Sequence, residues 1–155
     1  IIVSFGGASV GDHDLVAPAL IAAGAVLDFH KIAMRPGKPV MAGKLGKSIV
    51  LGLPGNPVSA YVTALLLLKP LVRHLSGALA PLPKRITISL GTELPQNGQR
   101  IDHLRGIWSE GLAFPVGVND SAMLKALSAS NILIIRDINA SEAAIGDLVN
   151  CLRTY

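Results

Sequence analysis

The first half of the chain alternates short apolar runs with loops rich in glycine and proline, and this pattern predicts an α/β fold. Residues 1–5 form an apolar run typical of a buried strand. Residues 15–23 carry apolar side chains at helical spacing, and Gly24 follows where glycine commonly ends a helix, which makes half of a βαβ unit. Further strands are expected over residues 26–34, 39–42 and 48–53.

A second, longer helix is expected after Asn56. Asn56 can accept hydrogen bonds at the N-cap, and Pro57 suits the first helical position because it lacks an N–H group. Apolar residues then recur at helical spacing to Leu75, with Gly77 past the end, so the helix should be largely buried. Its dipole and the free N–H groups of its first turn should face the same site as the first glycine-rich loop.

The character of the sequence changes after a proline-rich linker at residues 78–83. Short strand-like runs follow, with one helical turn near residues 121–127, and predict a small all-β barrel or sandwich. The runs cover residues 85–91, 100–108, 112–116, 132–136 and 148–152. The predicted domains are therefore an α/β part, residues 1–77, and a β part, residues 84–155.

Residues 1–77 hold too few strands and helices for a complete doubly wound domain, because a parallel sheet needs cover on both faces. They are expected to form part of a three-layer doubly wound domain. The chain is therefore expected to be the C-terminal part of a longer protein.

The composition is that of a soluble globular protein, since 50% of its 155 residues are hydrophobic. No charged n-region opens the chain, and the longest uncharged stretch, residues 48–68, is interrupted by Pro54 and Pro57. Neither secretion nor a membrane span is expected. The protein is expected to be cytoplasmic. The single cysteine, Cys151, cannot form an intramolecular disulfide and is expected to be a buried thiol.

Charge is distributed unevenly along the chain. The net charge is +4, and residues 29–92 contain no Asp or Glu, so this segment should attract anions. Its basic residues are Lys31, Arg35, Lys38, Lys44, Lys47, Lys69, Arg73, Lys84 and Arg85. Nucleic acid is a poor candidate because aromatic residues make up only 4% of the chain and do not lie between the basic ones. A small ligand with several negative charges fits better.

Three loops combine glycine with charged or polar residues after predicted strands. The first covers residues 6–14 (GGASVGDHD), the second residues 35–39 (RPGKP) and the third residues 53–57 (LPGNP). Open α/β sheets bind ligands at the carboxyl ends of their strands, so we expect one shared anion site. No Ser–His or Cys–His arrangement typical of a covalent nucleophile is visible.

In this order, and with Lys31 ahead of the second loop, the loops resemble the molybdopterin molybdenumtransferase family of molybdenum cofactor biosynthesis, which includes the enzymatic domain of gephyrin. Residues 119–121 (NDS) and 127–131 (LSASN) are similar to the family's C-terminal domain. The resemblance implies a molybdopterin-binding-like α/β domain followed by a β domain. It also implies an enzyme that inserts molybdenum from molybdate into adenylated molybdopterin, releases AMP, uses Mg²⁺ and acts as a homodimer with further N-terminal domains.

The resemblance also implies roles for particular residues. Asp14 would hold Mg²⁺ with Asp12 nearby, although both could simply cap the following helix. Lys31, Arg35 and Lys38 would act with Asp14 in catalysis by binding phosphate and molybdate oxygens; the alternative is a solvated basic face. The other expected substrate contacts are Gly6, Gly7, Ser9, Gly11, Pro36, Gly37, Pro54, Gly55, Asn56, Pro57, Ser59, Arg105 and Ser121.

Several of these residues also have purely structural interpretations. The glycines could serve tight turns, and Arg105 and Ser121 could be ordinary surface residues. Arg35 stands where the family's loop usually begins with lysine, which keeps the charge but replaces a point charge with a planar fork.

Two other functions remain open from the sequence. The first is a molybdopterin adenylyltransferase of the same superfamily, which lacks the appended β domain, so residues 84–155 argue against it. The second is a non-catalytic scaffold or binding module built on this fold. Tungsten could also take the place of molybdenum.

Overall fold

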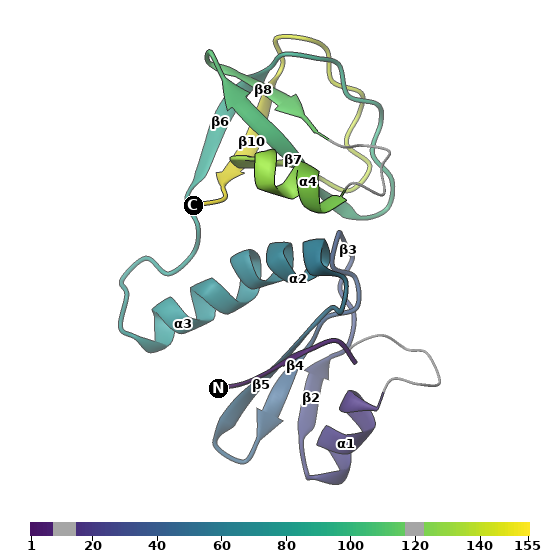
Figure 1. Cartoon of the computed structure of the whole chain (residues 1–155), viewed down its shortest axis with the longest axis vertical. Coiled ribbons are helices and arrows are strands. Elements are labelled where there is room, and N and C mark those ends of the chain that lie inside the picture. The colour runs from purple at the N-terminus through teal and green to yellow at the C-terminus, as the bar shows by residue number, and fades with distance from the viewer. Residues whose placement is uncertain (8–14, 117–122) are drawn as a thin grey trace. The chain divides into compact units, whose positions relative to one another are not determined.

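The computed structural model describes residues 1–7, 15–116 and 123–155, which fall into two compact units, Ile1–Pro81 and Leu82–Tyr155 (Figure 1). Each unit has its own hydrophobic core. The division between them lies inside the proline-rich segment 78–83.

The first unit is built on a mixed sheet with the strand order β1-β5-β4-β2. β1 (Ile2–Phe5) runs parallel to β5 (Ser48–Leu53), and β4 (Met41–Leu45) runs antiparallel to both β5 and β2 (Val26–Phe29). The prediction that the first strand is buried is wrong. Within the described residues β1 pairs with β5 alone and lies at the edge of this sheet, with Phe5 68% exposed.

Two other predicted strands differ from the observed ones. The strand expected over residues 26–34 ends at Phe29 and is followed only by the short β3 (Met34–Arg35). Between them the amide of Ile32 donates to the carbonyl of Lys38 over 3.2 Å, so the chain curls into a loop instead of extending the ladder. The strand expected over residues 39–42 is displaced to β4, whose start is fixed by the pairing of Met41 with β5.

Helix α1 (Val16–Ala22) packs against one side of this sheet, where it contacts Met41. The helix ends as predicted at Gly24, which has a φ of 92°. The amides of Gly24 and Ala25 donate to carbonyls of the last helical turn over 2.9 and 2.8 Å. These two bonds are the Schellman arrangement, in which glycine supplies the left-handed conformation.

A continuous helix runs from Pro57 to Leu75. It consists of α2 (Pro57–Thr63), one π-helical turn, η1 (Ala64–Leu68), and α3 (Lys69–Leu75), and Gly77 follows its end with a φ of 83°. Leucines of η1 pack against Leu51 and Leu53 of β5. The predicted cap at Asn56, the first position at Pro57 and the terminal Gly77 are all confirmed.

The two helices cover opposite faces of the sheet. Met41 packs with α1, whereas its neighbour Ala42 packs with the cluster that includes η1. Successive residues of a strand point to opposite faces, so the sheet has a helical layer on each side. The predicted α/β class with three layers is confirmed for this unit.

The long helix is only partly buried, contrary to the prediction. Val58 and Val62 are buried against the sheet, whereas Val72 and Leu75 are 46% and 53% exposed. The contacts of this helix with the sheet involve its first part, where Ala64, Leu67 and Leu68 pack on the cluster of Val40, Leu51 and Leu53. By length and composition this helix could also cross a membrane, but that is weak support because the core helix of a compact domain passes the same test.

The second unit is a closed barrel, which decides between the two expected β architectures. Its strands are β6 (Arg85–Leu90), β7 (Ile101–Ser109), β8 (Leu112–Pro115), β9 (Ile132–Arg136) and β10 (Leu148–Arg153), each within one residue of its predicted bounds. They pair in the order β7-β8-β6-β10-β9, and β9 also pairs with β7, which closes the ring. The predicted helical turn corresponds to α4 (Met123–Ala129).

The barrel interior is the core of this unit. Ile132 and Ile134 of β9 and Cys151 of β10 are 0% exposed and belong to one cluster. The predicted buried thiol at Cys151 is confirmed.

Candidate functional site

The strand directions place the three predicted loops at one edge of the sheet in the first unit. Because β4 is antiparallel to β5 and β2, and β1 is parallel to β5, three strands end where β4 begins. Gly6 and Gly7 follow β1, residues 54–56 follow β5, Lys31 follows β2, and residues 35–39 lead into β4. Ligand sites of open α/β sheets occupy this kind of edge.

The first and third loops are in direct contact. The amide of Gly6 donates to the carbonyl of Leu53 over 3.0 Å. An ideal Cβ on Gly55 would lie only 3.3 Å from the Cα of Gly6. Glycine at both positions therefore allows the two backbones to approach each other.

Residues 31–40, which contain Lys31 and the second loop and are called the basic loop below, are closed into a loop by two hydrogen bonds to one carbonyl. The amides of Ile32 and Val40 donate to the carbonyl of Lys38 over 3.2 and 3.0 Å. Lys31 directly precedes Ile32, and Lys38 supplies the accepting carbonyl, so both lysines lie beside these hydrogen bonds. The side chains of Lys31, Arg35 and Lys38 are all exposed.

The tip of the basic loop lies on helix α2. The Arg35–Pro36 peptide bond is cis, Pro36 is half-buried, and Gly37 is buried with a φ of 111°. A Cβ on Gly37 would overlap Cγ2 of Thr63 and would lie 3.4 Å from Cε of Met34. Only glycine fits between these two side chains in this conformation.

Thr63, which contacts the basic loop at Gly37, was not among the residues predicted from the sequence. Its side chain is 0% exposed, although the surrounding positions of the helix are apolar. A polar residue on the buried face of an apolar helix was the available signal.

The start of α2 corrects one expectation about the site. Oδ1 of Asn56 accepts hydrogen bonds from the amides of Val58 and Ser59, each over 3.1 Å, and lies 3.4 Å from the Ser59 hydroxyl. Pro57 has no N–H group, so the amides expected to be free are used by the helix's own cap. Pro54 is buried, whereas Gly55, Asn56 and Pro57 are exposed, so an anion here would meet the loop and the helix dipole.

Ser9, Gly11, Asp12, Asp14 and Ser121 lie outside the described residues, and their roles stay predictions. Among the residues that are described, no group of three or more His, Cys, Asp or Glu side chains is placed to hold a metal ion.

Arg105 lies on β7 of the second unit and is half-buried. Desolvation by burial lowers the pKa of its guanidinium below the ordinary value. This environment is not that of an ordinary surface arginine, although its contact with a substrate stays a prediction.

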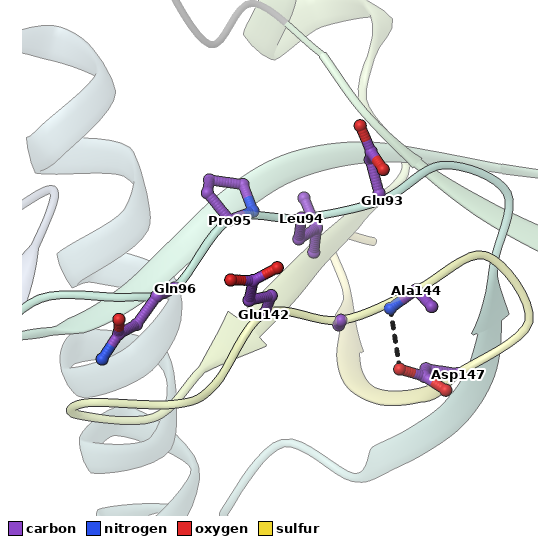
Figure 2. A pocket seen from close by; sticks show the side chains of 8 residues that line it. Glu93, Leu94, Pro95, Gln96, Glu142, Ala144 and Asp147 are labelled. Atoms are coloured by element: carbon purple, nitrogen blue, oxygen red, sulfur yellow. Dashed lines mark hydrogen bonds between the residues drawn. The ribbon is translucent and has the colours of Figure 1, made fainter.

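The second unit also contains a cavity of about 700 Å³ (Figure 2). Its walls are Glu93, Leu94, Pro95, Gln96, Glu142, Ala143, Ala144 and Asp147. One carboxylate oxygen of Asp147 accepts from the amide of Ala144 over 2.8 Å, which fixes the local turn. None of these described wall residues is basic, so the cavity suits neither molybdate nor a pyrophosphate.

Comparison with known families matches two consecutive parts of the chain. Residues 1–74 match the family described as "Probable molybdopterin binding domain", and residues 87–153 match "MoeA C-terminal region (domain IV)". The chain is 34% identical over 155 residues to the molybdopterin molybdenumtransferase of Haemophilus influenzae, covering 96% of this chain and 38% of that protein. It is 36% identical over 110 residues to the protein of the same name from a Nostoc species, covering 68% and 25%.

Solved structures show the same fold. The molybdopterin biosynthesis MoeA protein of Pyrococcus horikoshii superposes with a TM-score of 0.83 at 23% identity, covering 100% of this chain and 37% of that one. A molybdenum cofactor biosynthesis protein from Pyrococcus furiosus gives a TM-score of 0.65 at 23% identity, covering 92% and 55%.

Proposed function

Because the chain belongs to the molybdopterin molybdenumtransferase (MoeA) family and matches two domain models of molybdopterin proteins in order, we propose that it contributes the substrate-holding loops of such an enzyme. The reaction inserts molybdenum from molybdate into adenylated molybdopterin and releases AMP. The substrates are thus an adenylated pterin with a pyrophosphate link and a small oxyanion.

The observation that carries this proposal is the placement of the three loops at one edge of the sheet. The first and third loops offer backbone with little side-chain bulk, which suits close approach by a pyrophosphate. The second loop brings Arg35 and Lys38 to the same edge, and Lys31 lies just ahead of it; three exposed cations suit a doubly charged oxyanion.

Catalysis in this proposal rests on positioning and electrostatics. Gly6, Gly7 and Gly55 bring backbone to the pyrophosphate, and Lys31 and Lys38 bind molybdate and neutralise charge on the phosphate as AMP leaves. Arg35 can bind two oxygens at once through its planar fork.

The barrel of the second unit favours this function over an adenylyltransferase of the same superfamily, because it matches the MoeA C-terminal region. The proposal includes a homodimeric, cytoplasmic full-length protein that uses Mg²⁺. A Mg²⁺ site would depend on Asp12 and Asp14, which lie outside the described residues.

A matched pair of lysine variants tests the site. Lys38 lies at the loop edge of the sheet, whereas Lys47 lies in the turn between β4 and β5 at the opposite edge, roughly 15 Å along the strands. In the full-length protein, molybdate-dependent AMP release is measured across molybdate concentrations. Lys38→Gln should raise the KM for molybdate on the order of tenfold through loss of a charged hydrogen bond, while Lys47→Gln should leave it unchanged.

The outcomes separate the competing functions. If the full-length wild type releases no AMP in response to molybdate while still binding the oxyanion, the chain is part of a scaffold and the enzymatic proposal fails. If the two lysine variants change the KM equally, the anion site does not lie at the loop edge. Replacing molybdate with tungstate in the same assay determines which metal is preferred.

A further inference from the structure

A buried threonine supports the basic loop from beneath. Thr63 is 0% exposed at the end of α2, and its Cγ2 occupies the space that a side chain on Gly37 would need. Met34 borders the same space, with Cε 3.4 Å from the position of a Cβ on Gly37. The Gly37 backbone is therefore packed against two side chains.

The orientation of Thr63 is fixed by its own hydroxyl. Oγ1 donates to the carbonyl of Ser59 over 2.8 Å and to that of Ala60 over 3.1 Å. These bonds select one rotamer of a β-branched side chain, as is common for threonine in helices. With the hydroxyl turned towards the helix backbone, the methyl group is directed at the loop.

The contact between Thr63 and Gly37 lies next to the loop residues that carry the cationic side chains. Gly37 directly precedes Lys38, whose carbonyl closes the loop by accepting from Ile32 and Val40. Arg35 lies two residues before Gly37, and the side chains of Arg35 and Lys38 are exposed, so packing at Gly37 orders this part of the loop.

We propose that Thr63 is a positioning residue for the oxyanion: its methyl group sets the place of Gly37 and thereby of Arg35 and Lys38. The identity of the oxyanion rests on the proposed function, whereas the packing role does not. Thr63 itself is fully buried and does not touch the substrate.

Two substitutions separate the methyl group from the hydroxyl. Thr63→Ser removes the methyl and keeps the hydroxyl, while Thr63→Val keeps a methyl at the contact and removes the hydroxyl. Thr87→Ser, at an exposed threonine of β6, is the matched control for loss of a methyl group. All are made in the full-length protein.

Hydrogen exchange of the segment 31–40, followed by mass spectrometry, reports on the loop without any need for turnover. The amides of Ile32 and Val40, which close the loop, should exchange about fourfold faster in Thr63→Ser, the change expected for one lost methylene-sized contact. The KM for molybdate should rise by roughly the same factor with kcat little changed. Thr63→Val and Thr87→Ser should behave like the wild type in both measurements.

A double-mutant cycle tests the contact itself. Gly37→Ala should raise the KM for molybdate strongly because its Cβ meets the Thr63 methyl. Adding Thr63→Ser should make room for this Cβ. The KM for molybdate of the double variant should therefore be lower than the value expected by multiplying the two single effects.

The proposal is overturned if Thr63→Ser leaves both loop exchange and the KM for molybdate unchanged, or if Thr63→Val matches Thr63→Ser. Strict additivity in the cycle would also overturn it. Failure of the proposed function is a separate result: the wild type would then release no AMP, while the exchange pattern would still decide whether Thr63 positions the loop.

Discussion

The amide of Gly6 donates to the carbonyl of Leu53 over 3.0 Å, which continues the pairing of β1 with β5 one residue past the end of β1. The first and third loops consequently start in contact, and a shift of one moves the other. Gly55 completes this contact, because a Cβ there would lie 3.3 Å from the Cα of Gly6.

Gly55→Ala is therefore expected to impair substrate binding more than folding. Its Cβ would push the two loops apart by a few tenths of an ångström, and the KM for adenylated molybdopterin should rise roughly fivefold because positioning errors of this kind are costly. Stability should change by less than about 1 kcal/mol, since alanine also reduces the entropy of the unfolded chain. Gly98→Ala, where a Cβ would meet nothing within 4 Å, is the control for both measurements. An unchanged KM in Gly55→Ala would show that the loops do not act together.

Asn56 offers a way to separate the helix cap from anion binding. Asn56→Ala removes the acceptor of the Val58 and Ser59 amides and should cost about 1 kcal/mol in urea denaturation. Asn56→Asp keeps an acceptor and adds a negative charge that the helix dipole favours, so stability should stay within about 0.5 kcal/mol of the wild type. The same charge should weaken oxyanion binding several-fold by repulsion at the loop. Wild-type affinity for molybdate in Asn56→Asp would exclude this corner from the site.

Local signals in the sequence were sufficient for the elements of the barrel and for the helix ends. The strands of the second unit are short apolar runs between turn residues, and Gly24 and Gly77 end helices by a conformation that only nearby residues determine. Closure of the barrel could not be predicted in the same way, because the pairing of β7 with β9 joins segments far apart in the sequence.

The candidate site was predictable as a set of loops but not in its contacts. Composition identified Lys31, Arg35 and Lys38, and strand order brought them to one edge. The cap at Asn56 was predicted from local residue types, although the expectation that the first-turn amides stay free for a ligand was wrong. The placement of Gly37 on Thr63 depends on three-dimensional packing and was not predicted. A sequence pattern gives residue types and spacing, whereas these contacts depend on how loop and helix meet.

Cys151 should resist thiol reagents as long as the barrel is folded. Its side chain is 0% exposed, and burial raises the pKa of the thiol to about 11, so almost none of it is thiolate at pH 8. Labelling of the Cys151 peptide by a disulfide reagent, read by mass spectrometry, should be slow in native buffer and rapid in concentrated urea. Ser76→Cys, at an exposed helix end, is the control and should label rapidly in both. Rapid native labelling of Cys151 would contradict a closed barrel.

His103 on β7 carries a buried imidazole. It is 9% exposed, and its Nδ1 is buried without a hydrogen-bond partner among the residues that the structure describes. Burial lowers its pKa from 6.5 to about 4, with Arg85 acting in the same direction and the carboxylates of Asp102 and Asp137 opposing it. The neutral imidazole is thus favoured in the folded barrel.

The stability of the barrel should therefore fall as the pH drops from 6.5 to 4. In this range the unfolded chain binds a proton at His103 and the folded chain does not, so acid favours unfolding; above pH 6.5 neither form is protonated, and below pH 4 both are. The loss over the whole window should be about 3 kcal/mol, measured as the change in the free energy of unfolding from urea titrations at several pH values. His103→Gln should flatten this dependence, whereas His74→Gln, at an exposed position of α3, should retain it. If His103→Gln keeps the wild-type slope between pH 6.5 and 4, the acid sensitivity has another origin and His103 is protonated in the folded barrel.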